Sequence, residues 1–107
     1  METEAADIFR TLGDPTRRGV FERLAREGEL SVGDLVAGAG VSQPAVSQHL
    51  AVLRQAGLVS ERRDGRFVRY AARPHGLKPL IDWMGFYAGF WAERFDRLED
   101  LLSRMDQ

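Results

Sequence analysis

The chain has 107 residues, of which 44% are hydrophobic and 29% are charged, and its net charge is −1. This length fits one domain, and the composition is ordinary for a globular protein. No apolar run approaches the roughly 18 residues that a membrane-spanning helix needs, and the acidic start Met-Glu-Thr-Glu-Ala-Ala-Asp is unlike a signal peptide. We therefore expect a cytoplasmic protein that does not associate with a membrane.

The residue types also limit the chemistry. There is no cysteine, which excludes disulfides and thiolate metal sites, and the only histidines are His49 and His75. No nucleophile–base pair, phosphate-cradling glycine loop or metal-ligand motif indicates an enzyme. We therefore expect no catalytic residue, no cofactor and no bound metal.

Charge is distributed unevenly along the chain. Residues 1–41 carry a net charge of −3, residues 42–75 carry +4 and residues 76–107 carry −2. A local basic surface is typical of a DNA-binding face even where the total charge is close to zero. Exposed hairpins often carry arginines as well, so the charge pattern alone leaves both interpretations open.

The N-terminal third predicts three helices. Apolar residues recur at helical spacing over residues 4–12, which predicts a short amphipathic helix. Asp14 and Pro15 begin a second helix that runs to about Glu27, because aspartate is a favourable N-cap and proline fits the first helical position. Ser31 is a further N-cap and begins a third helix.

Residues 32–56 predict a helix-turn-helix. Gly40 lies in the turn, where a positive φ is often needed. Ser42 caps the second helix, and Val46 and Leu50 are expected to hold it against the first. The outward-facing positions are then Gln43, Pro44, Ser47, Gln48 and Ala51.

The outward-facing residues suit the major groove of DNA. Amides and hydroxyls hydrogen-bond to base edges, and alanine or proline can touch a thymine methyl group. The alternative is an ordinary solvated face, but such a face normally contains lysine and glutamate, and residues 41–53 contain neither. His49 is expected at the helix edge near a DNA phosphate, and Arg54 either contacts a phosphate or is solvated.

Residues 58–71 predict a β-hairpin, with strands at 58–63 and 66–71 and a tight Asp64-Gly65 turn. Arginines on either side of the turn can reach across a groove. Arg62 and Arg69 are placed either for backbone phosphates or for a salt bridge with Glu61. The predicted DNA-binding residues are Ser42, Gln43, Pro44, Ser47, Gln48, His49, Arg54, Arg62, Arg63, Arg66 and Arg69.

The C-terminal segment 77–105 predicts one long helix with more apolar surface than one domain can cover. With the helix at residues 4–12, it makes a dimer interface predicted to contain Ala5, Ile8, Phe9, Leu12, Leu80, Trp83, Met84, Tyr87, Trp91 and Phe95. Its aromatic residues could also line a small-molecule pocket formed by Trp83, Phe86, Tyr87, Phe90 and Trp91. Aromatic stripes at helical spacing are more often core, which favours a dimer core without a ligand.

Four motifs occur in order along the chain: Leu-Gly-Asp-Pro-Thr-Arg-Arg at 12–18, Ser-Gln-Pro-Ala-Val-Ser-Gln-His-Leu at 42–50, Leu-Arg-Gln-Ala-Gly-Leu-Val at 53–59 and Arg-Arg-Asp-Gly-Arg at 62–66. Together they resemble the ArsR/SmtB family of bacterial winged-helix repressors. The resemblance implies a single winged helix-turn-helix domain over residues 1–107, mainly α with a small β-hairpin, in the order four helices, hairpin, helix. It also implies a homodimer that binds a twofold-symmetric operator in double-stranded DNA, with 42–55 as recognition helix and 62–69 as wing.

The chain departs from the family in its signal-sensing residues. Many members sense metals through a cysteine-bearing segment that corresponds to residues 29–35, and others bind zinc through histidines of the last helix. Residues 29–35 contain no cysteine, and the last helix contains no histidine. Carboxylates alone make a poor site for zinc or copper, so we expect a repressor that is not a thiolate metal sensor and whose inducer is unknown. The alternative is a protein-interaction module that keeps the scaffold and binds another protein on its aromatic last helix.

Overall fold

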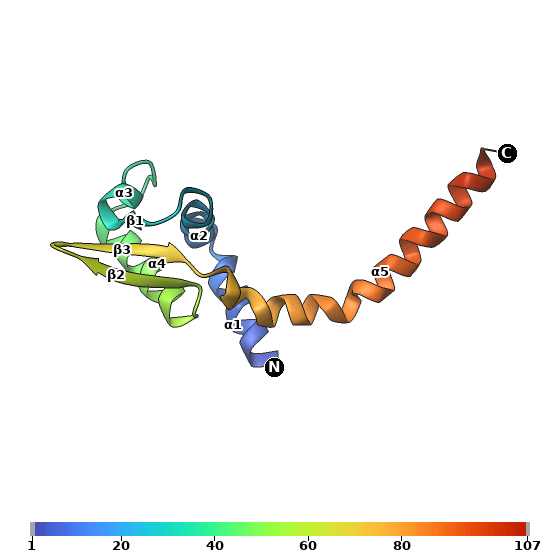
Figure 1. Ribbon diagram of the computed structural model, residues 1–107, viewed down its shortest axis with the longest axis horizontal. Coiled ribbons are helices and arrows are strands. Elements are labelled where there is room, and N and C mark those ends of the chain that lie inside the picture. The colour runs from blue at the N-terminus through green and yellow to red at the C-terminus, as the bar shows by residue number, and fades with distance from the viewer. Residues whose placement is uncertain (1, 107) are drawn as a thin grey trace.

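A computed structural model describes residues 2–106. It has the predicted mainly helical, winged helix-turn-helix architecture (Figure 1). The elements in chain order are α1 (Glu2–Gly13), α2 (Pro15–Glu27), β1 (Leu30–Ser31), α3 (Val32–Val36), α4 (Gln43–Gln55), β2 (Val59–Asp64), β3 (Phe67–Ala72), the 3-10 turn η1 (Pro74–Leu77) and α5 (Lys78–Met105).

Local capping chemistry determines where the middle helices begin. The Asp14 carboxylate accepts a hydrogen bond from the backbone N–H of Arg17 at 3.0 Å, and the Ser42 hydroxyl accepts one from Ala45 at 3.3 Å. Ser31 forms a reciprocal capping box at the start of α3. Each cap satisfies a backbone donor that the first helical turn would otherwise leave unpaired, so all three predicted N-caps are confirmed.

The sheet contains one more strand than the sequence predicts. β1 pairs antiparallel with β3, with Leu30 opposite Tyr70 and Ser31 opposite Arg69, and the strand order is β1-β3-β2. The predicted hairpin of β2 and β3 is confirmed, and β1 is a strand that the sequence did not predict. Two residues are too few to show the alternation that marks a strand, and the pairing partner lies far along the chain. Through β1, the wing is hydrogen-bonded to the segment that leads into α3.

The core lies between α2, α3, α4 and the start of β2. α2 and α4 pack on each other, and α3 packs on α4. Its most deeply buried side chains are Leu24, Leu35, Val46, Leu50, Leu53, Leu58 and Val59. The helical spacing of these residues on α4 confirms the predicted buried stripe, which leaves the opposite face of α4 free.

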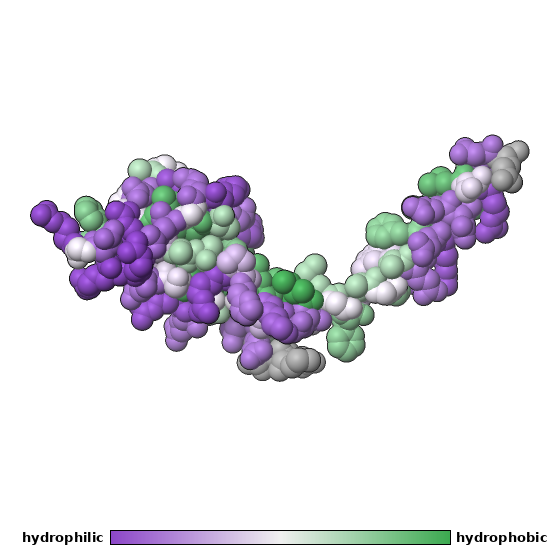
Figure 2. Space-filling view, in the orientation of Figure 1, coloured by the Kyte–Doolittle hydropathy of each residue, from purple (hydrophilic) through white to green (hydrophobic). Residues whose placement is uncertain are grey.

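Helix α5 projects from this body (Figure 1). None of its residues is buried, and only its first turns lie near the core, where Leu80 packs against it. The Cα radius of gyration is 18.9 Å, against about 13 Å for a compact domain of similar length. Green apolar side chains follow the projecting helix in the space-filling view (Figure 2). No helix within residues 2–106 is long and apolar enough to cross a membrane.

Candidate DNA interface

The turn before α4 presents this helix at the surface. Gly38 and Gly40 both have positive φ, at 85° and 72°, a conformation that glycine adopts without the Cβ clash of other residues. The positive φ predicted for Gly40 is confirmed. Val46 and Leu50 are fully buried on the inner side of α4, and this fixes which side of the helix faces outward.

The outer side of α4 carries short, uncharged polar groups. Gln43, Ser47 and Gln48 are exposed, together with Ser42 and Pro44 at the helix start. The N-terminal end of the helix adds the positive end of the helix dipole. This arrangement can donate hydrogen bonds to base edges and accept them, and residues 41–53 contain neither lysine nor glutamate.

His49 lies at the edge of this face and is half-buried. Its Nδ1 accepts a hydrogen bond of 3.3 Å from Nε of Arg17 on α2. The same guanidinium donates through Nη1 to the carbonyl oxygen of Thr11 in α1 at 3.2 Å. Sequence reasoning assigned no role to Arg17. The two residues are 32 positions apart, and no local pattern connects them.

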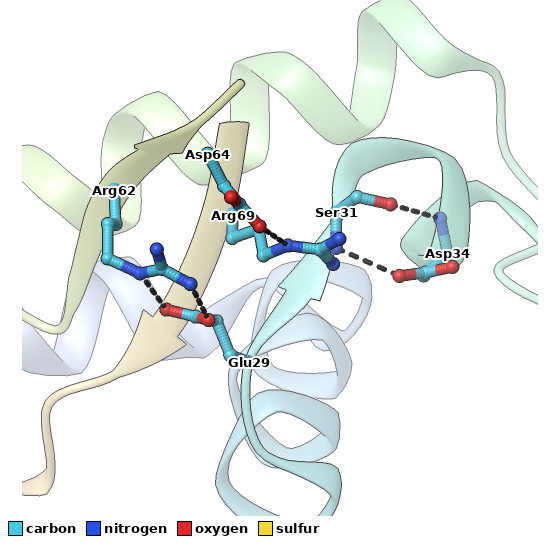
Figure 3. Close-up of polar contacts among 6 residues, drawn as sticks. All are labelled: Glu29, Ser31, Asp34, Arg62, Asp64 and Arg69. Carbon is cyan, nitrogen blue, oxygen red and sulfur yellow. Dashed lines mark hydrogen bonds and ion pairs between the residues drawn. The ribbon is translucent and has the colours of Figure 1, made fainter. Parts of the chain in front are cut away.

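The arginines of the wing divide into two kinds. Arg62 donates from Nε and Nη2 to the carboxylate of Glu29, at 3.0 and 2.6 Å (Figure 3). Arg69 donates to Asp64 at 2.9 Å. Arg62 and Arg69 are directly opposite on β2 and β3, where two like charges would repel. The two carboxylates offset that repulsion, so both arginines have a structural task within the chain.

Of the two alternatives predicted for Arg62 and Arg69, the salt bridge with Glu61 is wrong for both. Glu61 forms its ion pair with Arg54 at the end of α4. The reason is geometric, because neighbouring side chains on a strand point to opposite faces of the sheet. Arg62 therefore faces away from Glu61 and toward Glu29, the residue before β1.

Arg63 and Arg66 are left at the tip of the wing. Both are exposed, and neither forms an ion pair with any residue in the described part of the chain. Gly65 between them has a φ of 61°, which makes the tight turn possible. Two guanidinium groups that are not neutralised within the chain can bind phosphate or enter a minor groove.

The carboxylates that pair with the wing arginines are held in their charged form. The hydrogen bonds from Arg62 lower the pKa of Glu29, and the hydrogen bond from Arg69 lowers the pKa of Asp64. Glu29 in turn raises the pKa of Arg62. Glu29 and Asp64 therefore stay ionised near neutral pH, and the wing is held by charge-assisted hydrogen bonds.

The residues predicted for a dimer interface fall into three groups by their exposure within one chain. Ala5 and Ile8 are both only 3% exposed within one chain, so the prediction for these two is corrected. They face the chain's own interior because α1 packs between α2 and α5. Leu12 and Leu80 are partly buried. The others are exposed and include Phe9, Trp83, Met84, Tyr87, Trp91 and Phe95.

The aromatic residues of α5 do not form one enclosed pocket. A groove of about 340 Å³ is lined by Trp83, Met84, Tyr87 and Trp91. The prediction included Phe86 and Phe90, and it is wrong for these two, which do not line the groove. Phe86 is 81% exposed, and the Phe90 ring lies under the guanidinium of Arg94 at 4.1 Å.

No group of three or more His, Asp or Glu side chains in residues 2–106 could hold a metal ion. Near α4 and the wing, the side chains of Glu29, Arg54, Glu61, Arg62, Asp64 and Arg69 are engaged in the ion pairs described above. The uncharged polar side chains on the outer face of α4 and the two arginines at the wing tip are exposed and form no ion pair within residues 2–106.

The sequence and the fold of this chain are similar to those of known proteins. The family model described as bacterial regulatory protein, arsR family, matches residues 14–61, which extend from the N-cap of α2 into β2. The transcriptional repressor SdpR of Bacillus subtilis is 35% identical over 78 residues, which cover 73% of this chain and 86% of SdpR. The arsenical resistance operon repressor of Escherichia coli is 44% identical over 68 residues, or 64% of this chain and 58% of that repressor.

A solved structure shows the same fold over almost the whole chain. The ArsR-like transcriptional regulator from Rhodococcus sp. RHA1 aligns with a TM-score of 0.74 at 28% identity, covering 94% of this chain and 93% of that protein. The names of these relatives give no support to a protein-interaction module. The chain belongs to the arsR family of bacterial regulatory proteins and is a DNA-binding transcriptional regulator.

Proposed function

We propose that the protein is a homodimeric repressor that binds a palindromic operator, with α4 in the major groove and the wing tip against the neighbouring backbone or minor groove. The observation that carries this proposal is the uncharged amide and hydroxyl face of α4 beside two arginines that have no carboxylate partner in residues 2–106. Amide and hydroxyl groups read base edges, and arginine side chains hold phosphates.

The residues take different roles in this proposal. Gln43 and Gln48 read base edges, because glutamine can pair with adenine at N6 and N7. Ser42, Pro44 and Ser47 contact either base edges or the nearest phosphates. Arg63 and Arg66 supply the charge. Because Arg54, Arg62 and Arg69 are already paired with carboxylates, we assign them to holding the wing.

Helix α5 supports the homodimer. Its large side chains are open to solvent along its length, for example Trp91 at 54% and Phe95 at 61%. A contiguous apolar surface of this extent is rare on a monomer. A second copy that packs α5 and Phe9 against its own equivalents would cover it. Two recognition helices related by a twofold axis then suit half-sites about 34 Å apart.

The proposal contains neither a metal-sensing step nor a catalytic one. There is no cysteine to bind a thiophilic metal, and the named relatives are regulators. The inducer remains to be identified by experiment. Because a repressor binds chromosomal DNA, we place the protein in the bacterial cytoplasm.

Selection from random duplexes tests the proposal, followed by fluorescence anisotropy on the recovered sequence and sedimentation of the free protein. We expect a palindrome, a dimer at the concentrations used for binding, and affinity that falls steeply as salt is raised. A monomer that shows no preference among duplexes, and no binding below micromolar concentration at low salt, would refute it.

A further inference from the structure

The 3-10 turn η1, which leads into α5, touches the turn after α4 through two glycines. Gly76 in η1 lies so close to Gly57 that a Cβ added to Gly76 would be 2.1 Å from the Gly57 carbonyl oxygen. No side chain tolerates such a distance, and the obstacle is backbone, which cannot rotate away. Next to this contact, the N–H of Arg73 donates to the carbonyl of Leu58 at 2.7 Å. The segment that leads directly into α5 therefore packs against the turn that ends α4.

A second contact joins α4 to α1. The guanidinium of Arg17 bridges His49 in the middle of α4 and the carbonyl of Thr11 near the end of α1, at 3.3 and 3.2 Å. Thr11 is only 7% exposed. A planar guanidinium holds its two acceptors in fixed directions, so this bridge restrains both the distance between the helices and the rotation of α4 about its axis.

A third contact joins α1 to α5, so that the three contacts link α1, α4 and α5 in a triangle. The rings of Phe9 on α1 and Trp83 on α5 meet edge to face, with centroids 5.1 Å apart and planes at 86°. Helices α1, α4 and α5 are thus joined pairwise by contacts with little freedom. Helix α4 carries the proposed DNA-reading face, and α5 with α1 carries the proposed dimer interface.

We propose that the Gly57–Gly76 contact and the Arg17 bridge set the spacing of the operator half-sites that the dimer accepts, an inference that rests on the proposed function. In a dimer held through α5, the separation of the two α4 helices depends on how each α4 is fixed to its own α5. Adding one base pair between half-sites moves the second by about 3.4 Å and turns it by roughly 35°. To bind both half-sites, the two α4 helices must have the separation and the relative rotation that the spacer requires. The triangle of contacts determines both quantities.

Gly76→Ala changes this geometry at a known point. The gap to the Gly57 oxygen must open from 2.1 Å to at least 3.0 Å, and the displacement occurs in both copies of a dimer. The experiment uses the selected half-site in duplexes whose spacer is lengthened or shortened one base pair at a time. We expect wild type to prefer one spacer and G76A to prefer another or to accept several. Affinity of G76A for the wild-type operator should fall about tenfold or more, a modest part of the gap between specific and non-specific binding.

Gly19→Ala is the matched control. Gly19 lies in α2, and a Cβ there would meet nothing within 4 Å, so its spacer preference should equal that of wild type. Affinity for a single half-site should be the same in wild type, G76A and G19A, because the reading face itself is untouched. A change in the selected half-site sequence of G76A would contradict the proposed role.

Arg17→Gln gives a second, independent variant in case Gly76→Ala prevents folding. This substitution removes the bridge to His49. Arg18→Gln is the matched control, because Arg18 is the next residue and donates to the Leu12 carbonyl at 3.0 Å. If Arg17 only held a phosphate, R17Q would bind every spacer more weakly by the same factor. A changed spacer preference in R17Q, and not in R18Q, is the result expected.

The outcomes distinguish a failure of the proposed function from a failure of this inference. If wild type binds no palindrome, the proposed function and this inference both fail. If wild type binds one and every folded variant of Gly76 and Arg17 keeps its spacer preference, the proposed function stands and this inference is overturned. Circular dichroism and thermal unfolding of each variant establish which of them are folded.

Discussion

Arg62 in the wing and Glu29 before β1 form a two-pronged ion pair, with nitrogen–oxygen distances of 3.0 and 2.6 Å (Figure 3). The pair joins residues 33 positions apart and ties β2 to the segment that β3 also holds through β1. An arginine that looks like a DNA contact in the sequence is thus a brace of the wing. The charge available to DNA lies farther out, at the turn.

The first prediction separates bracing from tip arginines by their salt dependence. Arg66→Ala and Arg63→Ala should each reduce the slope of log affinity against log salt by about one, and weaken binding to all sequences alike, as the loss of one phosphate contact does. Arg62→Ala should leave the slope unchanged. The measurement is anisotropy on the operator and on a random duplex over a series of salt concentrations. An equal reduction in all three variants would show that Arg62 also binds phosphate.

The second prediction concerns the pH dependence of stability. Because Arg62 lowers the pKa of Glu29 from its ordinary value of 4.5, ionised Glu29 stabilises the fold above pH 4.5, and this contribution is lost as the pH falls through the lowered pKa. The difference in unfolding free energy between wild type and Glu29→Gln should therefore be constant near neutral pH and shrink below pH 4.5. Urea unfolding at a series of pH values measures it.

Arg62→Gln provides the control for that experiment. It removes the partner that lowers the pKa of Glu29, so it should abolish the same pH-dependent part of the stability. The double variant should then add nothing further in this pH range. A difference between wild type and E29Q that is the same at pH 3.5 and pH 7 would contradict the assignment.

The sequence predicted those features that depend on near neighbours. The caps at Asp14, Ser31 and Ser42 and the buried stripe of α4 follow from residue types a few positions apart, and the structure confirms them. The outer face of α4 follows from the stripe, since a helix that buries one side exposes the other. The candidate reading face could therefore be located without coordinates.

What the sequence could not predict joins distant residues. Four features depend on how the chain folds back on itself: the partner of Arg62, the partner of Arg17, the strand β1, and the close contact of Gly76 with Gly57. A carboxylate near in sequence, Glu61, was a natural candidate partner for Arg62, but strand alternation sends the two side chains to opposite faces. The same limitation applies to Ile8, whose burial in the core removes it from the predicted dimer surface.

The third prediction tests base reading by α4. Gln48→Ala should relax the preference at the base pair it contacts by about 1–3 kcal/mol, with the rest of the selected sequence unchanged. Gln55→Ala is the matched control, since Gln55 is an exposed amide in the last turn of the same helix and lies outside the proposed reading face. Selection from random duplexes with each variant compares them directly. If Q48A and wild type recover the same sequence with equal stringency, Gln48 does not read a base.

The fourth prediction concerns the start of α4. The Ser42 hydroxyl accepts the N–H of Ala45 at 3.3 Å, and loss of such an N-cap costs about 1 kcal/mol of stability. Ser42→Ala should lower the unfolding free energy by about that amount. Ser47→Ala, at an exposed position within the same helix, should not lower it, because alanine is the better helix former there. Urea unfolding of the two variants decides, and equal stabilities would argue that the cap contributes nothing.

The fifth prediction tests the proposed dimer interface at Trp83. This ring packs edge to face on Phe9 and is still 42% exposed in one chain, so a second copy can bury the remainder. Trp83→Ala should weaken the dimer by 2 kcal/mol or more, about thirtyfold, as truncation of a central aromatic residue does at protein interfaces. Phe86→Ala, at a position 81% exposed and outside the groove, should have a smaller effect. Sedimentation equilibrium measures both dissociation constants, and the monomeric variant should also lose its preference for a palindrome over a single half-site. If W83A remained as dimeric as wild type, the dimer interface would not include the first turns of α5.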